Sequence, residues 1–185
     1  MKLLGLCGSL RRASINRALL RAIGRVVPAG ATFELYEGLG EGLGDLPLFN
    51  SDITPEPAGA VALKAAIAGA DALVIATPEY NYSISAALKN AIDWASRPVA
   101  TSPLRGKPVG VVGAASGMSG AMRAQYHLRQ MLVFTDSPTL AQPEVLIPRA
   151  HERFVDGELT DASTNDLLRT FAAALVTHAA RYPRA

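Results

Sequence analysis

Short apolar runs alternate with amphipathic stretches along most of this chain. Three runs end abruptly at a polar turn and are typical of buried strands: Leu3 to Cys7, Asp71 to Thr77 and Val109 to Val112. Phe33 to Tyr36 alternates apolar and polar residues, and Val145 to Ile147 is a brief apolar run, so both predict further short strands. The pattern therefore predicts five strands.

Between and after these strands, apolar residues recur at helical spacing. In the first such stretch Leu19, Leu20 and Ile23 share one side while arginines occupy the other. Pro28 and Gly30 follow it, as expected where a helix ends. The predicted helices are Asn16 to Val27, Ala60 to Ala68, Ala87 to Ala95, Met122 to Val133 and Asp166 to Ala180.

Alternation of strand and helix predicts a three-layer α/β sandwich, because right-handed crossovers between parallel strands place helices on both faces of the sheet. We expect a single domain over residues 1–185, with a five-stranded parallel sheet of order 2-1-3-4-5. In such sheets a ligand binds beyond the carboxyl ends of the strands where the order reverses, here between the first and third strands. The loops that begin at Gly8, Pro78 and Gly113 lie at that edge.

The first of these loops, Gly8 to Asn16, carries serines, arginines and an asparagine immediately before a helix. Free amides at a helix N-terminus and the positive end of its dipole attract a phosphate, and these side chains add donors. Without a G-x-x-x-x-G-K-[ST] string, a triphosphate-binding P-loop is excluded. Taken alone, the loop leaves a second interpretation equally open, in which Ser14 only caps the helix.

The second loop, Thr77 to Ser83, is polar and aromatic although it follows a fully apolar strand. Turn amides could pair with the edge of a flat heteroaromatic ring while a tyrosine covers part of its face. The alternative is that Tyr80 and Tyr82 only anchor the start of the next helix. The third loop, Ala114 to Gly120, has small residues that would let a ligand lie close to the backbone.

Repeated glycines between Gly38 and Gly44 raise the question of a dinucleotide-binding motif. Their spacing never gives G-x-G-x-x-G, and a proline-bearing segment follows where that motif requires a helix. We therefore interpret this stretch as a loop.

Composition narrows the classes of function. The 185 residues carry a net charge of +2 with scattered basic residues, which argues against a nucleic-acid surface. Cys7 is the one cysteine, so an intramolecular disulfide is excluded and a reducing cytoplasm is expected. No apolar stretch approaches the roughly 20 residues that span a bilayer, so no membrane association is expected.

Two strings make the chain recognisable. GSLRRASIN (Gly8 to Asn16) and PEYNYSISAALKNAIDWASRP (Pro78 to Pro98) closely resemble signatures of the NADPH-dependent FMN reductase family, which includes quinone and chromate reductases. Ala124 to Val133 also resembles the fourth helix of that family. The resemblance implies a flavodoxin-like fold with FMN as cofactor and NADPH or NADH as electron donor.

The resemblance also implies which residues hold the cofactor. Ser85 and Ala86 depart from it, because the family commonly has Pro-Gly there, so the start of this helix and the shape over the flavin could differ. By the resemblance, Ser9, Arg11, Ser14, Ile15 and Asn16 surround the FMN phosphate, Pro78, Glu79, Tyr80, Asn81 and Tyr82 hold the isoalloxazine, and Ser116 lies near the ring.

The expected activity is transfer of electrons from the nicotinamide to quinones, free flavin, chromate or azo compounds. The flavin itself takes the hydride, so we expect neither a catalytic triad nor a metal site, and ping-pong kinetics if donor and acceptor use one space in turn. A non-enzymatic flavodoxin-like electron carrier is the alternative; such carriers are usually strongly acidic, unlike this chain. A module that binds a nucleotide without turnover is a further alternative. The family's habit implies a homodimer or homotetramer.

Overall fold

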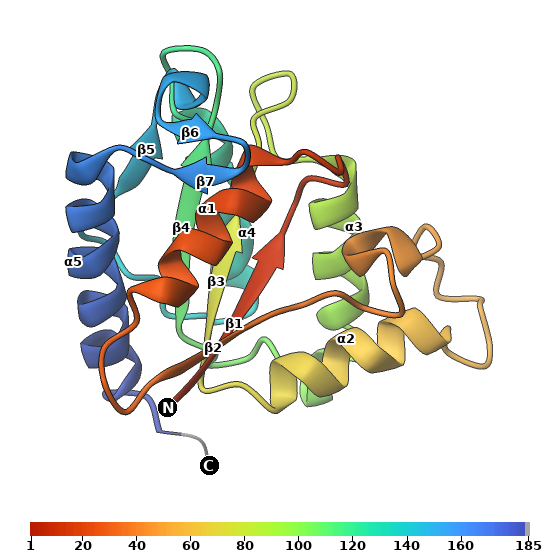
Figure 1. Ribbon diagram of the computed structural model, residues 1–185. Coiled ribbons are helices and arrows are strands. Elements are labelled where there is room, and N and C mark those ends of the chain that lie inside the picture. Colours follow the sequence, from red (N-terminus) through yellow and green to blue (C-terminus); the bar gives the residue numbers. More distant parts are fainter. Residues whose placement is uncertain (184–185) are drawn as a thin grey trace.

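A computed structural model describes residues 1–183, so the last two residues of the predicted domain 1–185 lie outside the described part. Its centre is a parallel five-stranded sheet of order β2-β1-β3-β4-β5, which confirms the predicted order (Figure 1). All four neighbouring pairs in this sheet are parallel. The strands are β1 (Lys2–Cys7), β2 (Thr32–Leu35), β3 (Ala72–Ala76), β4 (Val109–Ala114) and β5 (Val145–Ile147).

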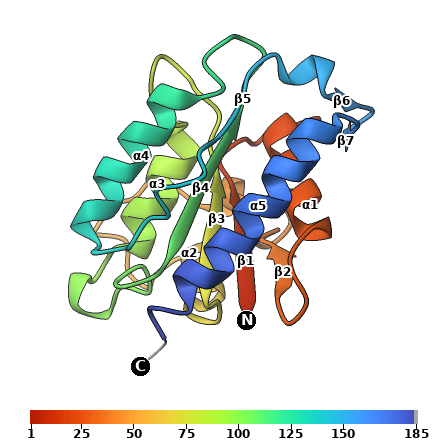
Figure 2. The same cartoon turned by 90° about the vertical axis from the view of Figure 1, so that its left-hand side faces the viewer.

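Helices cover both faces of the sheet and complete the three layers (Figure 2). One hydrophobic core joins α1 and α5 to one face, and a second joins α2, α3 and α4 to the other. Side chains along β1 alternate between them: Leu3 and Cys7 belong to the first core, and Leu4 and Leu6 to the second. The helices are α1 (Ile15–Arg25), α2 (Ala58–Ala68), α3 (Ala86–Ala95), α4 (Met122–Phe134) and α5 (Ala162–Ala179).

Local capping explains the largest difference between the observed helices and the sequence prediction. α5 begins four residues earlier than expected, because the Asp161 carboxylate accepts a hydrogen bond from the Thr164 amide, 2.8 Å away, and so caps the helix. A small antiparallel hairpin, β6 (Phe154–Val155) and β7 (Glu158–Leu159), was not predicted because two-residue strands carry no periodic signal. Three short 3₁₀ turns were also not predicted: η1 (Gly42–Asp45), η2 (Val99–Thr101) and η3 (Ala150–Glu152). None of the helices within residues 1–183 has the length and apolar character needed to span a bilayer.

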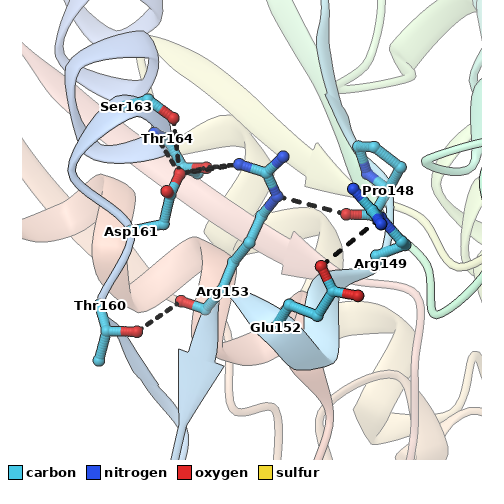
Figure 3. A network of polar contacts seen from close by, with 8 residues as sticks. All are labelled: Pro148, Arg149, Glu152, Arg153, Thr160, Asp161, Ser163 and Thr164. Atoms are coloured by element: carbon cyan, nitrogen blue, oxygen red, sulfur yellow. Dashed lines mark hydrogen bonds and ion pairs between the residues drawn. The ribbon is translucent and has the colours of Figure 1, made fainter.

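Arg153 fastens the segment between β5 and α5 (Figure 3). Its Nη1 donates to Asp161 Oδ1 (2.8 Å) and to Thr164 Oγ1 (3.0 Å). Just before it, the amides of Arg149 and Ala150 donate to the carbonyls of Gly117 and Ala115, each at 3.0 Å. The network therefore supports the loop after β4, one of the three predicted to meet a ligand.

Asp161 gives this network a testable dependence on pH. Hydrogen bonds from Thr164 and Ser163, together with Arg153, hold the pKa of its carboxyl far below the usual range. A lowered folded-state pKa stabilises the fold above the unfolded pKa of about 3.9, and this stabilisation is lost as the pH falls below that value. We expect Asp161→Asn to unfold at lower urea than the wild type at pH 7, with the gap narrowing towards pH 3.

The matched control for this prediction is Asp156→Asn, in the turn between β6 and β7. Asp156 is exposed, its φ of +50° suits asparagine equally, and its carboxylate makes no hydrogen bond or ion pair within the described residues. Its urea midpoint should stay within experimental error of the wild type at both pH values. A gap for Asp161→Asn that is constant with pH would contradict the assignment.

Candidate functional site

A cavity of about 210 Å³ lies at the carboxyl edge of the sheet, between the loops that follow β1, β3 and β4. The structure brings together there all the predicted cofactor residues except Asn81 and Tyr82. Its wall is formed by Ser9, Arg11, Ser14, Ile15, Asn16, Pro78, Glu79, Tyr80, Ala114, Ala115 and Ser116.

The N-terminus of α1 leaves amide donors open in this wall. The Ser14 hydroxyl accepts from the Arg17 amide (3.2 Å), and the Ser14 carbonyl accepts from the Ala18 amide (3.0 Å). The N–H groups of Ile15 and Asn16 precede these bonds and have no partner in the described chain. Arg11 beside them is exposed and makes no ion pair among the described residues. Ser14 thus caps the helix, as the simpler interpretation held, and two amides remain free for an anion.

Asn16 locks the first loop to the third. Its Nδ2 donates to the Ala114 carbonyl and its Oδ1 accepts from the Ala114 amide, both at 3.0 Å, and the residue is buried. Both ends of the side-chain amide are therefore already used within the protein. The backbone N–H of Asn16 and the second N–H of its Nδ2 make no hydrogen bond within the described residues.

Ser85 ties the first loop to the start of α3, a role that the sequence did not reveal. Its hydroxyl donates to the Gly8 carbonyl (2.5 Å) and accepts from the Leu88 amide (3.2 Å), capping α3. Gly8 lies so close to the second loop that a Cβ there would be 3.1 Å from Pro78 Cδ. The serine found in place of the family's common proline thus caps α3 and ties it to the first loop.

The second loop folds back in a tight turn at Tyr80 to Ser83. These two residues exchange backbone hydrogen bonds of 2.9 and 3.0 Å, and both central residues are left-handed, with φ of +49° at Asn81 and +66° at Tyr82. This is a type I′ turn; asparagine adopts the left-handed region readily, but tyrosine seldom does. Asn81 and Tyr82 lie at its exposed tip, outside the residues that line the cavity.

Glu79 anchors the second loop to the N-terminus of α4. Its side chain is only 7% exposed, and its carboxylate accepts from the Arg123 amide (3.0 Å) and from Arg123 Nε (2.7 Å). Burial alone would raise the pKa of Glu79, but the hydrogen bonds from Arg123 and from the Ala124 amide outweigh it and lower the pKa. The carboxylate faces α4, so it positions the loop and is not free to contact a ligand.

α4 makes two further contacts with this loop. The Arg123 guanidinium lies 3.7 Å from the centre of the Tyr82 ring, a cation–π contact, and His127 Nδ1 lies 3.2 Å from the Ser83 hydroxyl oxygen. These partners were missed because residues 79 and 123 are far apart in sequence. The sequence held no local signal for them, because the burial that makes Glu79 require a cationic partner is a property of the fold. Among residues 1–183, no group of three or more His, Cys, Asp or Glu side chains could hold a metal.

The sheet order and the position of the cavity define the class: a flavodoxin-like domain with a cavity at the strand-order reversal. Residues 1–152 match the family described as NADPH-dependent FMN reductase. A Pseudomonas aeruginosa protein named NAD(P)H-dependent FMN reductase is 44% identical over 178 residues, which cover 95% of this chain and 93% of that one. An Escherichia coli quinone reductase is 40% identical over 174 residues, which cover 91% and 89%.

A solved structure agrees with these sequences. The flavoenzyme NAD(P)H:(acceptor) oxidoreductase from Paracoccus denitrificans superimposes with a TM-score of 0.87 at 33% identity, covering 99% of both chains. The chain therefore belongs to the NADPH-dependent FMN reductase family. It is an oxidoreductase with FMN as cofactor and NAD(P)H as electron donor.

The Glu79→Gln variant tests whether Glu79 anchors the second loop to α4. A neutral amide keeps the shape but weakens the bonds to Arg123, so we expect the free energy of unfolding at pH 7 to fall by about 1–3 kcal/mol in urea titrations. Because the pKa of Glu79 is lowered, this loss should shrink as the pH drops below the unfolded value of about 4.3. Asp93→Asn, which removes an exposed i,i+4 pair with Lys89, should cost only about 0.3–0.5 kcal/mol. Equal losses for the two variants would refute the anchoring role.

Proposed function

We propose that the chain is an NAD(P)H:quinone oxidoreductase that holds FMN in the 210 Å³ cavity, with the phosphate on the N-terminus of α1 and the isoalloxazine between the second and third loops. The observation that carries this proposal is the pair of free amides, Ile15 and Asn16, beside Arg11 in the cavity wall. Bound FMN supplies the redox chemistry, taking electrons from the nicotinamide and passing them to the acceptor.

The phosphate end fits the donors that this chain presents. The amides of Ile15 and Asn16, the hydroxyls of Ser9 and Ser14, and the Arg11 guanidinium lie along one wall. Charge-assisted hydrogen bonds of this kind each contribute roughly 1.5–3 kcal/mol. The positive end of the α1 dipole favours the same charge. These donors suffice to hold a phosphomonoester that carries no bound metal ion, so no lysine is needed to bind it.

The ring end is assigned to Pro78, Glu79, Tyr80 and Ser116, which line the cavity from the second and third loops. Glu79 acts there by fixing the loop to α4, which holds the backbone of Pro78 and Tyr80 in place. Asn81 and Tyr82 project from the tip of the turn, and we assign them to the rim over the ring.

The protein's contribution to turnover is positional. No acid, base or nucleophile is required, so the loops need only orient the ring and leave one face open to two substrates in turn. Ping-pong kinetics follow from this shared space. Quinone as acceptor is supported by relatives named quinone reductase; free flavin, chromate and azo compounds are further acceptors that one open face could admit.

Assembly and location extend the proposal. α4 exposes Met122, Tyr126, Val133 and Phe134, whose large apolar side chains suit contact with a second copy of the chain in a homodimer or homotetramer. We place the enzyme in the cytoplasm, where its one cysteine, the buried and unpaired Cys7, would stay reduced.

The Arg11→Gln variant tests whether Arg11 contacts the phosphate of FMN or its ring. Removing one charge-assisted contact should raise the Kd for FMN by about tenfold, measured by quenching of flavin fluorescence, while the Kd for riboflavin stays the same. Arg105→Gln makes the same substitution at an exposed arginine just before β4, at the amino edge of the sheet, and should change neither constant. An equal loss for FMN and riboflavin would show that Arg11 does not contact the phosphate.

Initial rates test the reaction. With FMN-loaded protein, NADPH and menadione, we expect rapid NADPH oxidation and parallel lines in double-reciprocal plots, because donor and acceptor occupy one space in turn. Intersecting lines would contradict the shared space. Oxidation too slow to exceed that by free FMN would overturn the proposed function itself.

A further inference from the structure

A second hollow, of about 520 Å³, is lined by the first loop, α1 and the loop after β2. Arg11, Arg12, Arg17 and Arg21 line it, together with Gly40 and Glu41 from the loop after β2. We call it the arginine groove. Arg11 belongs to both hollows, so the groove continues from the end of the cavity assigned to the phosphate.

The guanidinium groups of this groove are largely without partners. Arg11, Arg12 and Arg21 are exposed and make no hydrogen bond or ion pair with their side chains within residues 1–183. Arg17 pairs with Glu37, but its Nε is buried and has no hydrogen-bond partner, which is true of no other buried side-chain nitrogen or oxygen in the described chain. Such an orphaned donor is rare in a folded protein and is consistent with a missing anionic ligand.

The lining of the groove is predominantly cationic. Its residues carry four guanidinium groups against the one carboxylate of Glu41; outside the lining, Glu37 pairs with Arg17 and Glu158 attracts Arg21. The Asp45 carboxylate accepts from the Leu39 amide at 2.6 Å and keeps its negative charge, but it does not line the groove. The net positive lining suits an anionic ligand group.

The glycine-rich loop forms the opposite wall. Gly38, Gly40 and Gly42 have φ of +61°, +138° and +63°, which other residues rarely adopt, and a Cβ on Gly40 would meet nothing within 4 Å. Gly40 has no side chain and nothing lies close to it, so the groove is open at this point. The loop lacks a dinucleotide fingerprint of its own, but it leaves room for a bulky group beside the arginines.

We propose that the arginine groove binds the 2′-phosphate of the adenosine end of NADPH and thereby selects NADPH over NADH. A phosphomonoester carries about −1.5 to −2 charge at pH 7 and three acceptor oxygens, which guanidinium forks match. NADH lacks this group and differs in nothing else. The inference rests on the proposed function, because it takes the nicotinamide to reach the flavin in the adjoining cavity.

Arg21 is the residue to vary, since it lies one turn beyond Arg17 on α1 and outside the FMN cavity. We expect Arg21→Gln to raise the KM for NADPH several-fold and Arg21→Glu about tenfold or more, with kcat and the KM for NADH unchanged. Arg105→Gln should leave all these constants unchanged. Equal changes with NADPH and NADH, or none with either, would overturn the proposal.

Equilibrium binding gives a readout independent of turnover. Calorimetric titration of the FMN-loaded protein with adenosine 2′,5′-bisphosphate should show binding that is weakened about tenfold in Arg21→Glu, whereas adenosine 5′-monophosphate should bind weakly and equally to both proteins. If the bisphosphate binds no better than the monophosphate, or if Arg21→Glu binds the bisphosphate as tightly as the wild type does, the groove has another ligand and the proposal is wrong. The wild-type protein could fail to oxidise NADPH and still bind the bisphosphate more tightly than the monophosphate. That result would count against the proposed function and leave the groove assignment supported.

Discussion

Reversal of the strand order between β1 and β3 determines where everything else in this molecule can lie. The first crossover, through α1, leads to the edge strand β2, whereas the chain after β2 returns to the other side of β1 and continues outward through β3, β4 and β5. Crossover helices therefore leave the centre of the sheet towards opposite faces, and the carboxyl ends of β1, β3 and β4 surround an opening. The cavity is a consequence of this topology before any side chain is considered.

Polar contacts then fix the loops around the opening. Asn16 joins the first loop to the end of β4, Ser85 joins the first loop to the start of α3, and Glu79 joins the second loop to α4. Arg153 and Asp161 hold the segment that supports the third loop (Figure 3). These contacts use the side-chain groups of Asn16, Ser85 and Glu79 within the protein, so the donors left for a ligand are backbone amides, serine hydroxyls and exposed guanidinium groups. A rigid rim with few catalytic side chains suits a cofactor that carries out the chemistry itself.

Much of this could be predicted from sequence because the signals are local. Apolar runs mark β1, β3 and β4 since buried parallel strands are apolar on both faces, and strand–helix alternation gives the sheet order. The start of α5 was misplaced because its cap, Asp161, precedes the apolar pattern. Pairing of Glu79 with Arg123 could not be read from spacing, since it depends on the sheet bringing two distant loops together. The glycine-rich stretch was predicted to be a loop. The arginines beside this stretch belong to α1 and to the loop that precedes α1, and only the fold brings them next to the glycines.

The central claim is that the α1 N-terminus receives the phosphate of FMN through the amides of Ile15 and Asn16. Titration of ¹⁵N-labelled protein, followed by amide proton and nitrogen shifts, tests this atom by atom. Both amide protons should move downfield with FMN and stay in place with riboflavin, because only FMN brings a charged acceptor to them. If FMN binds, as its quenched fluorescence would show, while both signals remain unmoved, the phosphate lies elsewhere and the account of the site is wrong.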